Sequence, residues 1–268
     1  ISPMGYRVWP TAATRSKPTS GGAIVQPGCG ALIASGRLGA IAVSGQAPSL
    51  GAHNSRADIN GAGGNPDPAT VTLSGTLSGS TRVVFVGGSF GETSPATDSL
   101  GSTVTQLGTD LGYASGLWPD FGVMTYVINN AAGSGSYTVS VDKSNSFPLG
   151  EISVAVLEAA TSGTRTIVQT QGNIAGQGAG VGYSSPSITT TGPAIIFAYW
   201  SGDADSPINP KDVTASAGWE IIESAFFDST SYVQFAVAYR EVSGAGTYSL
   251  TWTPVVNQGA VMSMVAVQ

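Results

Sequence analysis

Apolar and polar residues alternate in short runs along most of the chain, and one succession of runs occurs twice. Residues 135–141 read Gly-Ser-Tyr-Thr-Val-Ser-Val, and residues 246–252, about 111 positions later, read Gly-Thr-Tyr-Ser-Leu-Thr-Trp. An apolar run precedes each copy, at 83–86 and at 195–198. Because successive side chains of a strand point to opposite faces, a period of two predicts β-strands, here separated by turns rich in Gly, Ser, Asn and Pro.

No segment shows a helical period over eleven residues, so helix should be nearly absent. The first set of predicted strands covers 70–77, 82–86, 103–107, 123–129, 137–141 and 152–157. The second set covers 166–170, 187–191, 194–200, 219–223, 233–241, 247–253 and 260–267. The pattern predicts an all-β protein, an antiparallel β-sandwich that is jelly-roll-like.

The two similar half-units allow two arrangements, tandem domains or one sandwich in which the halves interleave. An isolated half leaves long strand edges unpaired, and interleaving covers more of them. We therefore expect residues 66–268 to form one β-sandwich domain.

Residues 1–65 differ from the rest. They are rich in Gly and Pro, and the run 60–68 reads as a linker because both residue types interrupt regular structure. Short apolar pieces contain Leu32, Ile33, Ile41 and Val43, which need burial somewhere. The composition predicts an N-terminal arm that anchors the chain to a partner.

Several pieces in order resemble a β-sandwich domain of tailed-phage virion proteins and bacterial secreted proteins. They are the apolar strand at 82–86, DSLGSTVT at 98–105, TYVIN with GSYTV at 125–139, and YREVSGAGTY at 239–248. The second departs from the family's DSxGNxYT pattern at Ser102 and Val104. The resemblance covers residues 69–268, and it implies a non-enzymatic structural protein at the virion surface: a head decoration protein, a fibre or a tail accessory subunit.

Composition points the same way. Only 10% of the residues are charged, against roughly 25% in an ordinary soluble domain, so the surface should be packed against neighbours. We expect a homo-oligomer that also binds other virion proteins. Ten scattered basic residues argue against a nucleic-acid partner, and no apolar stretch is long enough to cross a membrane. The chain starts at Ile1 without a signal-peptide pattern, which leaves open an upstream segment.

Few residues suit catalysis or metal binding. His53 is the only histidine, and no G-x-S-x-G motif accompanies it, so a Ser-His-Asp triad is not expected. Cys29 is the only cysteine, which excludes an intrachain disulfide. Asp203 and Asp205 follow a predicted strand and suit Ca²⁺ ligation, but a solvated Asx-rich loop has the same pattern. We expect no cofactor, no metal and no catalytic residue.

Loop aromatics support a rival function, a secreted or fibre-borne carbohydrate-binding module that takes a host-surface glycan. Trp118 and Tyr113 are the candidate sugar contacts, although a loop tryptophan also serves packing. Trp200 and Trp252 fall in predicted strands and are expected in the core.

Overall fold

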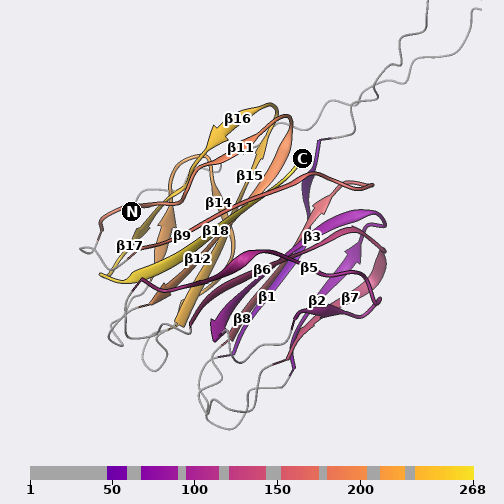
Figure 1. Ribbon diagram of the computed structural model, residues 1–268, viewed down its shortest axis with the longest axis horizontal. Helices are drawn as coiled ribbons and strands as arrows, with labels where there is room; N and C mark the ends of the chain where they lie inside the picture. Colours follow the sequence, from indigo (N-terminus) through magenta and orange to yellow (C-terminus); the bar gives the residue numbers. More distant parts are fainter. Residues whose placement is uncertain are drawn as a thin grey trace, which may run out of the picture. The chain divides into compact units, whose positions relative to one another are not determined.

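Every described strand pairs antiparallel with its neighbours (Figure 1). The computed structural model describes residues 47–58, 68–89, 95–114, 121–142, 152–174, 180–203, 212–226 and 233–268. No helix occurs in these ranges, and about 70% of their residues are in strands. The predicted all-β antiparallel sandwich is confirmed.

The first half contains two sheets, one of five strands in the order β1-β8-β3-β6-β5 and one of three in the order β2-β7-β4. A sheet ordered 1-8-3-6 that faces one ordered 2-7-4 has the topology of a jelly roll. The fifth strand joins the larger sheet beside β6. The bounds are β1 Ser49–Asp58, β2 Ala69–Thr76, β3 Ser80–Ser89, β4 Thr97–Asp98, β5 Thr105–Gly112, β6 Phe121–Ala131, β7 Ser134–Val141 and β8 Ile152–Ala160.

The second half repeats this order with β9-β18-β12-β15-β14 in its large sheet. Its small sheet is split into β10-β17-β13 and β11-β16, because Pro186 lies between β10 and β11 and lacks the N–H a ladder needs. The bounds are β9 Ile167–Ile174, β10 Tyr183–Ser184, β11 Ile188–Thr190, β12 Ala194–Asp203, β13 Val213–Ala215, β14 Glu220–Ala225, β15 Val233–Val242, β16 Gly246–Tyr248, β17 Thr251–Pro254 and β18 Gly259–Val267. The sequence repeat is therefore a repeat of the whole jelly roll.

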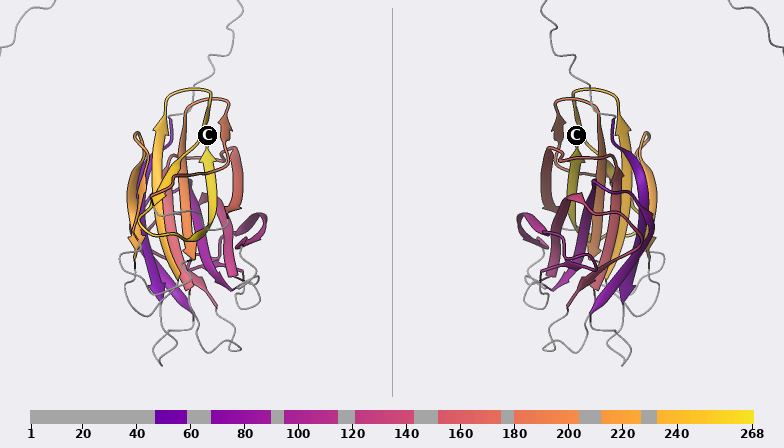
Figure 2. Two further views of the ribbon diagram at one scale, coloured as in Figure 1. Left: turned by 90° about the vertical axis from the view of Figure 1, so that its left-hand side faces the viewer. Right: turned by 90° about the vertical axis from the view of Figure 1, so that its right-hand side faces the viewer.

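The two halves do not interleave, contrary to the expectation. Among the described strands no sheet takes members from both halves, and the two five-stranded sheets instead pack face to face (Figures 1 and 2). In β3, Val83 and Phe85 face the other half, whereas Val84 and Val86 face the small sheet of their own half. The large sheets are buried on both faces, which gives four layers of sheet in all.

Three stacked aromatic rings mark the centre of the core between the halves. The ring of Tyr199 lies 5.1 Å from that of Phe85 and 5.9 Å from that of Phe235, with interplanar angles of 20° and 13°. The Tyr199 hydroxyl pairs with Ser153 Oγ of the first half at 2.6 Å, so the buried phenol is satisfied. Gly87 is required beside it, because a Cβ there would lie 2.6 Å from the Tyr199 hydroxyl.

Replacing Phe85 by Ala should lower the free energy of unfolding by about 3–5 kcal/mol, since Phe85 is fully buried between the halves. Denaturant unfolding followed by circular dichroism and tryptophan fluorescence measures the change. Both signals should still change in one shared transition. The control Leu100→Ala, at a position 42% exposed, should change stability by less than about 0.5 kcal/mol. Two separated transitions in the wild type would contradict a shared core.

The N-terminal boundary of the sandwich lies earlier in the chain than expected. Residues 49–58, assigned from sequence to the arm, form β1 and pair with β8 along the edge of the large sheet. Gly51 allows this pairing, because a Cβ there would lie 2.6 Å from Glu158 Oε2. The compact unit spans Gly45–Gln268, whereas the arm residues Leu32, Ile33, Ile41 and Val43 lie outside the described residues.

The two ends of this unit differ in the length of the connections between their strands. At one end, here called the loop end, Asp58 pairs with Ile152 and Asp203 with Gly259, and the long connections of both halves leave from these strand ends. At the other end, the turn end, short turns join β2 to β3 and β6 to β7. The chain enters β1 at the turn end, where Ser49 pairs with Ala160.

Candidate functional site

The candidate sugar contacts are not found together on the described surface. Tyr113 is only 8% exposed and lies between the large sheets, where its hydroxyl hydrogen-bonds Ser201 Oγ at 2.9 Å. The expectation that Tyr113 contacts a glycan therefore fails, because its ring belongs to the core between the halves. Trp118 lies outside the described residues. Trp200 and Trp252 are fully buried, as expected.

His53 lies on β1 and contacts the second half. Its Nδ1 lies 2.7 Å from Glu223 Oε1 of β14, and Ser55 Oγ donates a hydrogen bond to Glu223 Oε2 at 2.5 Å. A catalytic triad needs the serine bonded to the histidine. Here both bond the carboxylate, so the three residues form a clamp across the two halves and no activated nucleophile.

Asp203 and Asp205, which the sequence allowed either as Ca²⁺ ligands or as part of a solvated loop, are not both among the described residues. Asp203 ends β12, and Asp205 lies outside the described residues. Within the described ranges no group of three His, Cys, Asp or Glu side chains is placed to hold a metal ion.

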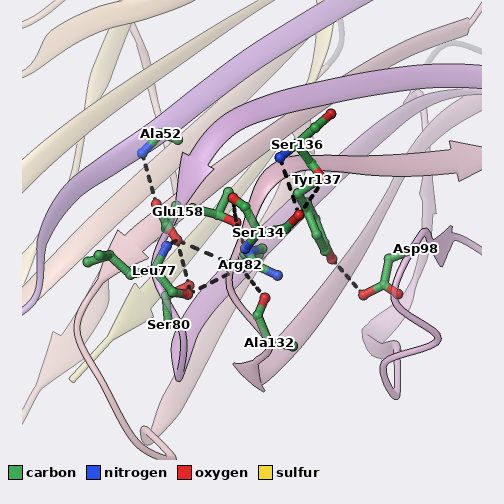
Figure 3. Close-up of polar contacts among 11 residues, drawn as sticks. Ala52, Leu77, Ser80, Arg82, Asp98, Ala132, Ser134, Ser136, Tyr137 and Glu158 are labelled. Atoms are coloured by element: carbon green, nitrogen blue, oxygen red, sulfur yellow. Dashed lines mark hydrogen bonds and ion pairs between the residues drawn. The ribbon is translucent and has the colours of Figure 1, made fainter.

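A buried ion pair lies between the two sheets of the first half, at the turn end (Figure 3). Arg82 is fully buried on β3, and its Nη2 lies 3.9 Å from Glu158 Oε1 on β8. Arg82 Nη2 donates to the carbonyl of Ala132 at 2.7 Å, and its guanidinium stacks 3.8 Å from the Tyr137 ring centroid. Arg82 Nε and Nη1 have no acceptor among the described residues.

The Glu158 carboxylate joins three segments of the chain. It accepts hydrogen bonds from Ser80 Oγ at 2.6 Å, from Leu77 N at 2.8 Å and from Ala52 N at 3.1 Å. Leu77 and Ser80 flank the turn between β2 and β3, and Ala52 lies on β1. The carboxylate thereby fixes the edge strand and this turn to β8.

The second half has a neutral version of the same arrangement. By register, Ala194 and Gln268 occupy the positions of Arg82 and Glu158. Gln268 Oε1 accepts from Thr191 N at 2.7 Å, just as Glu158 accepts from Leu77 N. The second half has Ala194 in place of the buried Arg82, and there the amide of Gln268 replaces the carboxylate of Glu158. The negative charge of Glu158 is therefore needed to balance Arg82, whereas the acceptor oxygen that both side chains share is needed to bind the backbone of the turn.

Glu158→Gln should cost about 3–5 kcal/mol of unfolding free energy, because it leaves the buried Arg82 charge without a counter-ion. The double variant Arg82→Met/Glu158→Gln should recover most of this loss, since it copies the neutral chemistry of the second half and keeps the acceptor for Leu77. Chemical denaturation of both single variants and the double variant gives the coupling energy. Additive losses would show that the two charges do not compensate each other.

Tyr137 links this pair to Asp98 on β4. The Tyr137 hydroxyl donates to Asp98 Oδ2 at 2.7 Å, and Asp98 Oδ1 accepts from the backbone N–H groups of Leu100 and Ser102. Burial by itself raises the pKa of Asp98, but the bonds from Ser102, Tyr137 and Leu100 outweigh it and hold the pKa below its usual value. Burial and the bond to Asp98 raise the pKa of Tyr137 far above its usual value.

A lowered folded-state pKa means that ionised Asp98 stabilises the protein above the unfolded pKa, about 3.9. This stabilisation is lost as the pH falls from there through the folded pKa. Asp98→Asn should therefore be less stable than wild type at pH 7, and the gap should narrow below about pH 4. Thermal unfolding between pH 7 and pH 2.5 tests this. A constant gap would contradict the role of the charge, and Asp110→Asn, on the exposed face of β5, is the matched control.

A cluster of buried polar groups lies near the loop end of the second half. Gln234 Nε2 donates to Gln258 Oε1, and the indole N–H groups of Trp200 and Trp252 have no acceptor among the described residues. None of these four side chains is more than 2% exposed. The cluster therefore belongs to the core and offers no surface to a ligand.

One hollow lies on the described surface of the second half, beside the entry of the chain. It measures about 420 Å³ and is lined by Gly218, Trp219, Glu220, Tyr239, Arg240 and Glu241; we call it the Tyr239 hollow. Tyr239 pairs with Glu220 across β15 and β14, and its hydroxyl donates to Glu220 Oε2 at 3.2 Å. Glu241 Oε1 accepts from Leu50 N at 2.8 Å, which ties the rim of the hollow to β1.

Charge in the Tyr239 hollow is mainly negative. Burial, the bond to Glu220 and the carboxylates of Glu220 and Glu241 together raise the pKa of Tyr239. The Arg240 guanidinium instead lies over the ring of Tyr248, 5.3 Å from its centroid. Glu220 and Glu241 are both exposed. The hollow thus presents a partly exposed phenol ring between two carboxylates.

Sequence reasoning missed the Arg82 network, the His53 clamp and the Tyr239 hollow. The Arg82 network could have been found in the sequence, because Arg82 and Glu158 are charged residues inside apolar strand runs. The clamp and the hollow could not, because they depend on contacts between β1 and the β14–β15 region. His53 and Glu223, for example, are 170 positions apart in the chain.

Comparison with protein-family models, with curated proteins and with solved structures found no match to this chain. In the described part of the chain, no helix is long and apolar enough to cross a membrane.

Proposed function

We propose that this protein is a structural subunit of a tailed-phage virion, a head decoration, fibre or tail accessory protein that acts by protein–protein assembly. The observation that carries the proposal is the polarity of the double jelly roll. The N-terminal segment enters at the turn end, and the long connections of both halves leave from the loop end. Such a subunit attaches through one end and presents the other.

The edge strands of the two large sheets are covered by side chains of the other half, which favours association with other proteins through side chains over strand addition. Gln171 and Asn173 of β9 donate to the carbonyls of Thr109 and Gly112 at 2.8 Å each, which covers the β5 edge. The clamp of His53, Ser55 and Glu223 covers the opposite side, where β1 lies beside β14. Covered edges discourage uncontrolled strand addition, so the N-terminal segment and the faces of the unit are left for specific contacts.

A carbohydrate-binding module is the second candidate, and the Tyr239 hollow is the observation in its favour. An aromatic ring beside carboxylates and an arginine is chemistry that suits sugar hydroxyls. A glycan array separates the two functions. Binding that Tyr239→Ala abolishes would favour the module, whereas absence of binding favours assembly.

Removing residues 1–44 should leave a folded unit that no longer assembles, because Gly45–Gln268 is compact by itself and the arm is the attachment. Circular dichroism and thermal unfolding check the fold. Incorporation into particles, measured by mass spectrometry of purified virions, checks the function against the full chain. Normal incorporation of the shortened protein would refute anchoring by the arm, and absence of the full chain from particles would refute the virion function.

A further inference from the structure

The basic and acidic residues of this chain are strongly segregated. Residues 1–46 contain four basic residues, Arg7, Arg15, Lys17 and Arg37, and no acidic one. The other six basic residues and all 16 acidic residues lie beyond them, so residues 47–268 carry a formal charge of −10. In two neighbouring copies of the chain, the negatively charged parts formed by residues 47–268 repel each other unless a positively charged segment lies between them.

We propose that the Tyr239 hollow receives the basic N-terminal segment of a second copy of this chain, with Arg15 and Lys17 entering the hollow. The inference rests on the proposed assembly function and names its partner surface. A guanidinium or ammonium group placed over the Tyr239 ring gains cation–π attraction, and Glu220 and Glu241 supply charge-assisted acceptors.

The spacing of the two carboxylates suits this segment. Glu220 lies opposite Tyr239, and Glu241 follows Tyr239 by two residues along β15, so the α-carbons of the two glutamates are diagonal neighbours about 7–8 Å apart. Residues two apart in an extended chain share a face and are separated by about 6.4–6.8 Å. A segment bound in extended form would direct Arg15 and Lys17 to the same side, one toward each carboxylate.

The position of the hollow favours exchange between copies. Leu50 is bonded to Glu241 at the rim, and residues 1–46 join the unit just before it. A two-fold axis that brings two hollows together therefore brings the start of each arm next to the partner's hollow. The contact is then reciprocal, as closed dimers require.

Charge reversal in the full-length chain tests the proposal by sedimentation at low and at moderate salt. Glu220→Lys and Arg15→Glu/Lys17→Glu should each raise the dissociation constant of self-association by about tenfold or more. The matched controls are Asp110→Lys, an exposed acid on β5, and Arg7→Glu/Arg37→Glu, which makes the same charge change elsewhere in the arm. Both controls should associate nearly as the wild type does.

Mixing separates contact between copies from contact within one chain. An equimolar mixture of Glu220→Lys and Arg15→Glu/Lys17→Glu proteins should recover wild-type association, because each arm then meets a hollow of opposite charge. If the mixture does not regain wild-type association but a single chain that carries Glu220→Lys, Arg15→Glu and Lys17→Glu together does, the arm docks on its own chain. That result would refute the exchange between copies. Equal behaviour of Glu220→Lys and Asp110→Lys would refute the hollow alone, and a monomeric wild type absent from virions would refute the assembly function itself.

Discussion

The face-to-face packing of the two five-stranded sheets is the constraint on which the rest of the structure depends. Each large sheet has apolar side chains on both faces, and its own small sheet covers only one of them. Separation of the halves would expose Phe85, Phe197, Tyr199 and their neighbours to water, at a cost proportional to the apolar area. The halves therefore form one folding unit although each has a complete jelly-roll order.

This constraint also explains the hydroxyl groups inside the core. Tyr199 pairs with Ser153, Tyr113 with Ser201, and Thr125 Oγ1 with Ser263 Oγ at 3.1 Å, each across the two halves. Burial raises the pKa of Tyr199 far above its usual value, although its bonds to Ser153 and Ser201 act the other way, so the phenol stays a neutral donor. Such pairs fix the register of the sheets, because a shift by one residue would leave buried hydroxyls unpaired.

Much of the fold could be predicted from the sequence. The period of two located most strands, and the doubled pattern indicated two similar half-units. The face-to-face packing of the two halves was harder to predict from the sequence. The continuous apolar run 83–86 did indicate it, because a strand that is buried on both faces shows no alternation of apolar and polar residues. Strand β1 was missed because Ser49–Asp58 lacks an apolar stripe and is held through backbone pairing with β8.

The candidate site could be predicted least, for a physical reason. Glu220, Tyr239 and Glu241 come together only because β14 and β15 pair at the rim of the sheet beside β1. None of these residues stands out locally, and an exposed carboxylate at a strand end is ordinary by itself.

Comparison of the two halves separates the features that both jelly rolls share from those that only one half has. The acceptor role of Glu158 recurs in Gln268, so the fold itself requires it. By register, Tyr239 stands where the first half has Thr125, whose hydroxyl pairs with Ser263 inside the core. The first half buries this position, whereas the second places a partly exposed phenol there beside two carboxylates. The shared core does not require this difference at the rim, which lies beside Leu50, close to the point where the chain enters β1.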